Sequence, residues 1–165
     1  QRFNECKLEI HPDKTKIVYC KSENRKEEYS VNSFKFLGIE FRPRVAKNKE
    51  GKFFQTFTSL VPTSSFRKIG DYIKSLNLHS QTKLDIYQLT SLINDRLTGW
   101  FNYFKKWGIY QKCGGFFYNL NQRLIKWVMN RYKRLNNKTK AIGFLRVNQR
   151  LSPDLFVHWK YGFCI

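Results

Sequence analysis

The residues that could carry out acid–base or metal chemistry are scattered along this chain of 165 residues. It has five Asp and seven Glu. None of them forms an Asp-Asp, Asp-x-Asp or Glu-x-x-His cluster of the kind that holds catalytic metal ions. The three histidines, His11, His79 and His158, are far apart and give no i, i+4 pair. We expect His158, beside Trp159, to be a packed and hydrogen-bonded residue. The sequence therefore predicts no metal site and no catalysis by this chain alone.

Lys and Arg carry the clearest chemical signal. They number 31 against 12 acidic residues, which gives a net charge of +19. Residues 97–150 contain twelve Lys and Arg and no Asp or Glu. An ordinary solvated helix face mixes both signs, because i, i+4 ion pairs stabilise it. The acid-free stretch therefore favours binding to a polyanion over the alternative of a merely solvated face, and nucleic acid is the expected partner.

Other partners and compartments are less favoured. The basic residues alternate with aromatic ones over many elements, whereas a membrane-surface helix would gather them on one amphipathic segment. No signal peptide and no apolar run of membrane-spanning length are present, so we expect no membrane partner. The four cysteines show no C-x-x-C spacing and are expected to be reduced thiols of a cytoplasmic protein. Because the chain begins at Gln1, we expect a piece of a longer protein.

Residues 1–62 have the pattern of a small antiparallel sheet. Alternating apolar residues predict strands over 14–20, 34–41 and 52–61. Turns are expected at Pro12–Asp13 and at Glu50–Gly51. Gly38, inside the second strand, indicates a bulge or a close backbone approach.

Residues 63–165 have the pattern of three to four helices. Apolar residues three and four apart predict helices over 63–76, 83–106, 116–135 and 139–150. The Thr and Ser residues after Pro62 are candidate N-caps, and glycines 108, 114 and 115 are expected to separate the second helix from the third. The predicted fold class is α+β, a small antiparallel sheet followed by a helical bundle, with domains over 1–62 and 63–165.

The third predicted helix places cations and apolar residues on different sides. Leu120, Leu124, Val128 and Leu135 form its apolar side. Arg123, Lys126 and Lys133, with Arg134 continuing the series, are the best candidates for contacts with consecutive phosphates. Trp100 and Phe104 are interpreted as core residues, whereas Tyr103 could equally stack on a base. The remaining candidate RNA contacts are Arg42, Arg44, Arg96, Lys105, Lys106, Arg131, Arg146 and Arg150.

An ordered set of motifs resembles one protein family. The segments LEIHPDKTKIVYC, FKFLGIEFRPR, LTGWFNYF, LNQRLIKWVMNRYKRL and LFVHW follow one another in this order. Together they resemble the group II intron reverse transcriptases, also called maturases, over nearly the whole chain. The resemblance implies that residues 1–62 are the end of a polymerase palm. It implies that residues 63–165 are the thumb, also called domain X or the maturase-specific domain, which binds RNA.

The resemblance also implies roles for individual residues. Lys14 corresponds to the late-palm lysine, an auxiliary catalytic group that would offset charge on the leaving pyrophosphate. Phe36, Leu37 and Gly38 correspond to the hairpin that grips the primer end. The implied partners are group II intron RNA, whose splicing the protein would assist, template–primer nucleic acid, and an N-terminal fingers and palm half that this sequence lacks.

The family's catalytic Tyr-x-Asp-Asp motif does not occur in the sequence. Mg²⁺ is therefore expected only with the palm half, no cofactor is expected here, and polymerase activity is not expected from this chain alone. One alternative stays open, a stand-alone basic RNA- or DNA-binding protein unrelated to introns. A metal-dependent nuclease or polymerase is disfavoured, because the sequence has no carboxylate cluster to hold the metal ions. The family resemblance predicts an exposed apolar face where a palm would pack, and a stand-alone protein predicts none.

Overall fold

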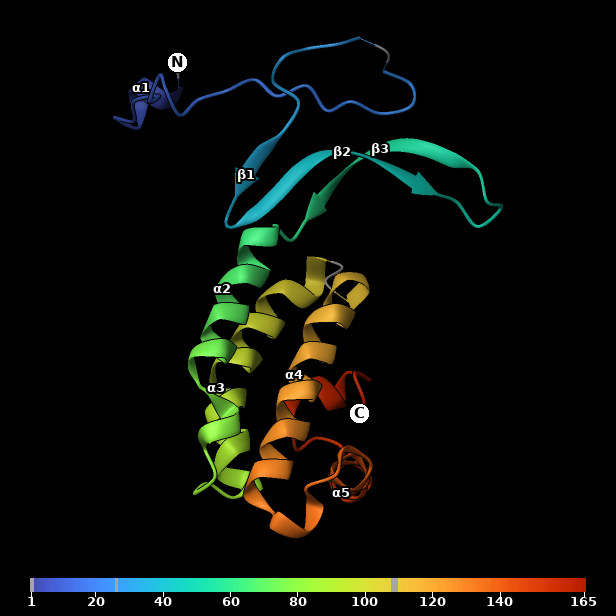
Figure 1. The fold of residues 1–165 in the computed structure, drawn as a ribbon. Helices are drawn as coiled ribbons and strands as arrows, with labels where there is room; N and C mark the ends of the chain where they lie inside the picture. The colour runs from blue at the N-terminus through green and yellow to red at the C-terminus, as the bar shows by residue number, and fades with distance from the viewer. Residues whose placement is uncertain (1, 26, 108–109) are drawn as a thin grey trace. The chain divides into compact units, whose positions relative to one another are not determined.

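The computed structural model describes residues 2–25, 27–107 and 110–165. The chain divides into two compact units, residues 1–60 and residues 61–165. The first contains a three-stranded antiparallel sheet and the second contains a set of helices (Figure 1). This confirms the predicted α+β class. The division lies two residues before the boundary that the sequence predicts, and the assignment of the two parts as palm and thumb stays a prediction.

The sheet of the first unit has the strand order β1-β2-β3. Its strands are β1 (Phe34–Phe36), β2 (Ile39–Lys47) and β3 (Phe53–Leu60). The continuous strand predicted over 34–41 is wrong, because Leu37 and Gly38 form a two-residue turn between β1 and β2. Both have positive φ, 48° and 73°, which is the backbone that a tight hairpin turn requires. Gly38 therefore lies in a hairpin turn and not in a β-bulge.

The two turns that the sequence predicts in this unit are confirmed. At the β2–β3 turn, the Asn48 side-chain oxygen accepts hydrogen bonds from the backbone N–H groups of Glu50 and Lys52, at 3.0 and 2.8 Å. Gly51 has φ +88°, a conformation that glycine adopts without strain. Near the N-terminus, after the short helix α1 (Arg2–Glu5), the Thr15 N–H donates to the carbonyl of His11 across the Pro12–Asp13 turn.

The strand predicted over residues 14–20 is wrong. This segment is irregular, and the side chain of Ile17 is 97% exposed. One backbone hydrogen bond of 2.9 Å joins the Tyr19 N–H to the carbonyl of Val31. Alternating apolar residues form a strand only where a neighbouring strand completes the hydrogen-bond ladder, and this segment does not join the β1-β2-β3 sheet.

The second unit consists of helices, as predicted; α2, α3 and α4 run alongside one another, and α5 crosses them (Figure 1). The longer ones are α2 (Thr63–Ser75), α3 (Ile86–Phe104), α4 (Tyr110–Arg131) and α5 (Lys138–Leu151). A short helix α6 (Val157–Lys160) follows them. Single 3-10 turns complete the unit: η1 (Leu78–Ser80), η2 (Lys105–Trp107) and η3 (Lys133–Leu135).

The residues at which α2 and α3 begin differ from the predicted ones, because other residues cap these helices. The N-cap of α2 is Pro62, and Thr63 is already helical, so the predicted Thr or Ser cap is wrong. Helix α3 starts later than predicted because Asp85 caps it. The Asp85 carboxylate accepts from the Gln88 N–H at 2.8 Å, and the Gln88 side-chain oxygen accepts from the Asp85 N–H at 2.9 Å. This reciprocal capping box fixes where α3 begins.

The core of the helical unit is built mainly on α3 and α4. Leu89, Ile93 and Leu97 are fully buried, as their spacing predicts, and Phe104 is 7% exposed. Trp100 is only half-buried and packs in an aromatic cluster with Phe66, Phe104 and Phe116. Phe101, which was not among the predicted core aromatics Trp100 and Phe104, is fully buried and stacks on Tyr161 with ring centroids 4.1 Å apart.

The predicted separation of the second and third helices at the glycines is wrong for Gly114 and Gly115. Both lie inside α4, which starts at Tyr110, and Gly108 lies outside the described residues. Each glycine weakens a helix by about 1 kcal/mol relative to alanine. Burial of Cys113 and Phe117 on either side of the pair offsets that cost. At its other end α4 stops at Arg131, so the predicted end at residue 135 is also wrong.

Candidate nucleic-acid interface

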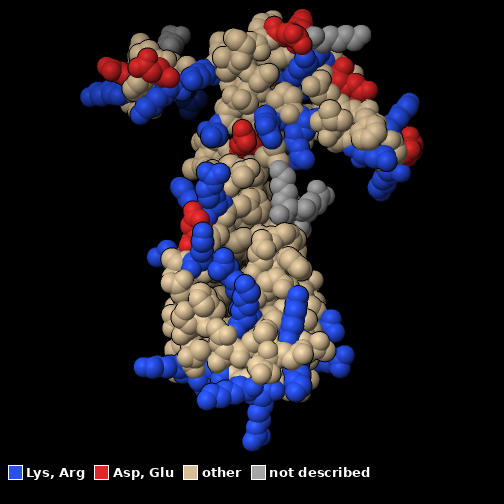
Figure 2. Space-filling view, in the orientation of Figure 1, with Lys and Arg blue, Asp and Glu red and all other residues tan. Residues whose placement is uncertain are grey.

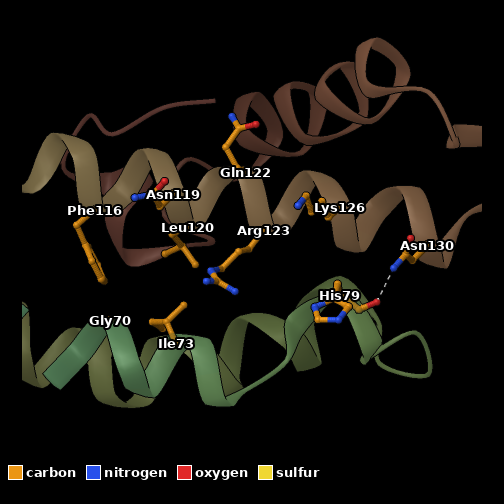
Figure 3. Close-up of a pocket in the computed structure, with 10 residues that line it drawn as sticks. All are labelled: Gly70, Ile73, His79, Phe116, Asn119, Leu120, Gln122, Arg123, Lys126 and Asn130. Carbon is orange, nitrogen blue, oxygen red and sulfur yellow. Dashed lines mark hydrogen bonds between the residues drawn. The ribbon is translucent and has the colours of Figure 1, made fainter. Parts of the chain in front are cut away.

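A groove lies within the helical unit between α2 and α4, with η1 at one end (Figure 3). Its volume is about 670 Å³. Figure 3 shows Arg123 reaching from α4 toward α2, next to the side chains of Leu120 and Ile73. The lining residues are Gly70, Ile73, His79, Phe116, Asn119, Leu120, Gln122, Arg123, Lys126 and Asn130.

The burial of α4 fixes which of its residues reach this groove. Leu120, Leu124 and Val128 are 0–1% exposed, as the predicted apolar side requires. Leu135, the fourth residue of that predicted side, is half-buried and lies in η3, outside the helix. Because the apolar side of α4 faces the core, Arg123 and Lys126 are left at the groove.

The last turns of α4 are tied to the segment that connects α2 and α3. The indole N–H of Trp127 donates to the carbonyl of Gln81 at 2.9 Å, and the Asn130 side chain donates to the carbonyl of His79 at 2.8 Å. Arg131 donates to the carbonyl of Thr82. These three bonds satisfy carbonyls of a non-helical segment and hold η1 against α4, so they fix one end of the groove.

Besides the imidazole of His79, four polar side chains in the groove have no partner within the described part of the protein. Asn119, Gln122, Arg123 and Lys126 make no hydrogen bond and no ion pair with the described residues. The groove residue Asn130, by contrast, is bonded to a backbone carbonyl. The four unpartnered side chains offer two cationic groups and two amides to a ligand, which is the chemistry that phosphates and base edges require.

The charge around the groove is strongly positive. Residues 61–165 contain 18 Lys and Arg and 4 Asp, a net +14, whereas residues 1–60 contain 13 Lys and Arg and 8 acids, a net +5. The one ion pair among the described residues of 61–165 joins Lys160 to Asp154 at 3.9 Å. Figure 2 shows Lys and Arg gathered over the end of the helical unit where α4 gives way to η3. Such a surface attracts polyanions because its cations far outnumber its acids.

The other predicted contacts lie elsewhere on the helical unit. Lys133 and Arg134 are exposed on η3, beyond the end of α4, so the prediction that they continue one helix face is wrong. Arg131 is half-buried, and its bond to Thr82 gives it a structural role. The remaining predicted contacts are Arg96, Tyr103 and Lys106, exposed on α3 and η2, Lys105, half-buried on η2, and Arg146 and Arg150, exposed on α5.

Arg96 is held in place by an aromatic neighbour. Its guanidinium carbon lies 4.6 Å from the ring centroid of Tyr72, whose hydroxyl donates to the carbonyl of Leu92 at 3.1 Å. Stacking on a ring restricts the guanidinium while its outer face stays exposed. Arg96 is therefore pre-organised on the seam between α2 and α3, away from the groove lining.

In the first unit the structure brings two of the predicted polymerase-type positions together. Lys14 and Phe36 line one open hollow. Lys16, Lys35 and Phe34 are among its other lining residues. Leu37 and Gly38 lie at the adjoining β1–β2 turn, and Arg42 and Arg44 are exposed on β2. The roles implied for these residues stay predictions.

The titratable groups that are buried do not form a reactive site. His158 is fully buried, and its Nε2 lies 2.8 Å from the Asn121 side-chain oxygen, as expected of a packed histidine. Burial lowers the pKa of His158 to about 3 and raises the pKa of the Cys113 thiol to about 12. Among residues 2–25, 27–107 and 110–165, no three His, Cys, Asp or Glu lie together as a metal site would need. No helix in this described part is long and apolar enough to cross a bilayer.

Sequence reasoning missed three polar residues of the groove, His79, Asn119 and Gln122. Two of them were visible in principle, because Asn119, Gln122, Lys126 and Asn130 follow one another at helical steps of three and four. His79 comes from a different element, so no spacing within α4 could reveal it.

Comparison with known families places the groove in a defined domain. Residues 66–143 match the family model of the group II intron maturase-specific domain. No curated protein and no solved structure matches the chain. The matched range begins inside α2, contains α3 and α4 and ends inside α5, so it includes every residue that lines the groove. The family resemblance drawn from the motifs is thus confirmed over residues 66–143, which match the maturase-specific domain of group II introns.

Proposed function

We propose that the helical unit binds structured group II intron RNA and assists its splicing by holding the RNA fold. One observation carries the proposal: the maturase-specific domain presents unpaired cations, with Arg123 and Lys126 in a groove and no acid between residues 97 and 150. Cations without protein partners can bind phosphates without first breaking an ion pair within the protein. RNA strands that repel one another can then pack together, while the RNA itself performs the chemistry.

The test is the salt dependence of RNA binding by a quadruple variant in which Arg123, Lys126, Lys133 and Arg134 are replaced by Gln. Each phosphate contact contributes about 0.7–0.9 to the slope of log K against log salt concentration. Loss of four contacts should therefore lower the slope by about 3. The matched control replaces Lys7, Lys21, Lys49 and Lys52 by Gln, which removes the same charge from the first unit. Equal slopes for the two variants would contradict the assignment.

We propose further that residues 1–60 take part in holding template–primer nucleic acid when a polymerase palm is present. The supporting observation is the hollow that Lys14 and Phe36 line, which offers cations and aromatic rings together. The exposed apolar side chains of this unit are the surface on which such a palm would pack. Replacement of Lys14 by Gln should weaken primer extension by the assembled polymerase while intron RNA binding stays unchanged, and weakening of both together would argue against a separate role.

A further inference from the structure

The groove between α2 and α4 has an apolar floor beneath its basic edge. Ile73 and Leu120 are 2% and 1% exposed, and the ring of Phe116 is half-buried beside them. Figure 3 shows Ile73, Leu120 and Phe116 between the two helices, with Arg123 next to Leu120 and Ile73 and with Phe116 farther along α4. Phosphate oxygens gain nothing from apolar contact, so a surface that only neutralised phosphates would need no such floor. An aromatic ring that shares a groove with a guanidinium suits a nucleotide, because the base packs on the ring while the cation meets a phosphate.

The size of the groove fits a small planar group. Its volume of about 670 Å³ falls in the range of roughly 300–1,000 Å³ typical of sites for small organic ligands. Gly70 faces this space on the α2 side, where an added Cβ would make an ordinary contact of 4.0 Å with the Phe116 ring and a larger side chain would extend into the groove. Asn119 and Gln122 lie on the side of α4 away from α2 and form the outer edge (Figure 3).

Resting on the RNA binding proposed above, we propose that this groove receives an unpaired nucleotide of the bound RNA. The base lies over Phe116 and the apolar floor, and Arg123 and Lys126, farther along α4, hold phosphates of the same strand. The bases of a continuous duplex are stacked inside the helix and cannot enter, so the groove selects a bulge, a loop or a strand end. The helical unit therefore recognises an unpaired nucleotide of the RNA at this groove, in addition to the negative charge of the phosphates.

The proposal is tested with two RNA hairpins of equal length, one fully paired and one with a single bulged nucleotide. Equal length keeps the number of phosphates the same, so the difference in affinity isolates the unpaired base. The full chain should bind the bulged hairpin about tenfold more tightly, as stacking of one base on an aromatic side chain provides. Equal affinities of the wild-type protein for the two hairpins would overturn the proposal.

The groove is then blocked without a change of charge by Gly70→Leu. This variant should lose the preference for the bulge, while its affinity for the paired hairpin stays within about twofold and its salt slope is unchanged. The control is Gly143→Leu, at an exposed glycine of α5 with nothing within 4 Å of an added Cβ, which should behave as wild type. A Gly70→Leu protein that is folded and keeps the preference would overturn the proposal.

A second measurement does not depend on the folding of any variant. The fluorescent base 2-aminopurine at the bulge should be quenched on binding of the wild-type protein, because it stacks on Phe116, and unchanged fluorescence would count against the proposal. Loss of the bulge preference in the presence of micromolar nucleoside monophosphate would instead assign the groove to a free nucleotide. Absence of binding to both hairpins at low salt would contradict the proposed RNA binding itself. Equal binding to both would contradict only the assignment of the groove.

Discussion

The two units of this protein bury their apolar residues to very different degrees. In the described part of residues 1–60, Ile39 and Leu60 are the buried apolar residues, whereas Ile17, Phe53 and Leu37 are 97%, 70% and 69% exposed. In residues 61–165 the long helices bury most of theirs, including Leu89 and Trp127 at 0%. Helices that pack side by side complete a core within one chain. A three-stranded sheet has two faces and needs another layer to cover them.

Charge follows the same division. The helical unit, which has its own core, also carries the larger excess of cations, +14 against +5. Its stability and its attraction for polyanions are therefore combined in one unit, and the maturase-specific match lies within that unit. We expect the helical unit to account for most of the stability and the RNA affinity of the chain.

The largest expected effect tests where the stability lies. Replacement of Leu124 by Ala, at a fully buried position of α4, should lower the free energy of unfolding by about 2–5 kcal/mol, because it leaves a cavity in the core. The matched change Leu8→Ala, at a residue 56% exposed in the first unit, should cost less than about 0.5 kcal/mol. Chemical denaturation measures both values. Similar losses for the two variants would contradict the division into a self-sufficient unit and a dependent one.

The buried His158 gives the helical unit a pH dependence. The folded state does not protonate His158 until about pH 3, whereas the unfolded chain does so near 6.5. Stability is therefore fully present above pH 6.5 and falls as the pH drops toward 3, by at most about 1.4 kcal/mol per pH unit. His158→Gln should reduce this slope between pH 6.5 and 4.5, and the exposed-site control His79→Gln should keep it. Unfolding curves measured between pH 6.5 and 4.5 give the slope of the free energy of unfolding against pH. An unchanged slope in His158→Gln would exclude His158 as the source of the pH dependence.

The smallest effect concerns the start of α3. Asp85→Ala removes the capping box and should destabilise the helical unit by about 1 kcal/mol. Asp71→Ala, at an exposed position of α2, removes the same charge without removing a cap and serves as the control. Thermal unfolding should show a lower midpoint for Asp85→Ala alone. Equal shifts in both variants would mean that net charge and not the cap is responsible.

The sequence predicts most of the helical unit because the spacing of apolar residues along each helix indicates which side is buried. Leu89, Ile93 and Leu97 are buried as their spacing requires. Phe101 also fits this period, four residues after Leu97, but the spacing equally allows Trp100, and the choice depends on packing against Tyr161 about sixty residues along the chain. The glycines at 114 and 115 indicate a break, yet tertiary packing carries α4 through them. Strand prediction failed over residues 14–20 because alternation shows which face could be buried but not whether a neighbouring strand exists.

The candidate interface was predictable in part for the same reason. Arg123 and Lys126 follow from the helical period and the missing acids, both of which are local properties of the sequence. The groove itself joins α2, η1 and α4, so His79 and the opening at Gly70 depend on tertiary contacts. Arg131 is the opposite case. The sequence predicts that it contacts RNA, whereas in the structure its side chain donates a hydrogen bond to the carbonyl of Thr82.

The central claim is that the helical unit recognises folded RNA and is more than a polycation. The most direct test is a salt titration of binding to a structured group II intron RNA and to a duplex DNA of equal length. We predict tighter binding to the intron RNA that persists at about 0.15 M salt, where purely electrostatic contacts are largely screened. Equal binding to the two nucleic acids that collapses together as salt rises would contradict the claim.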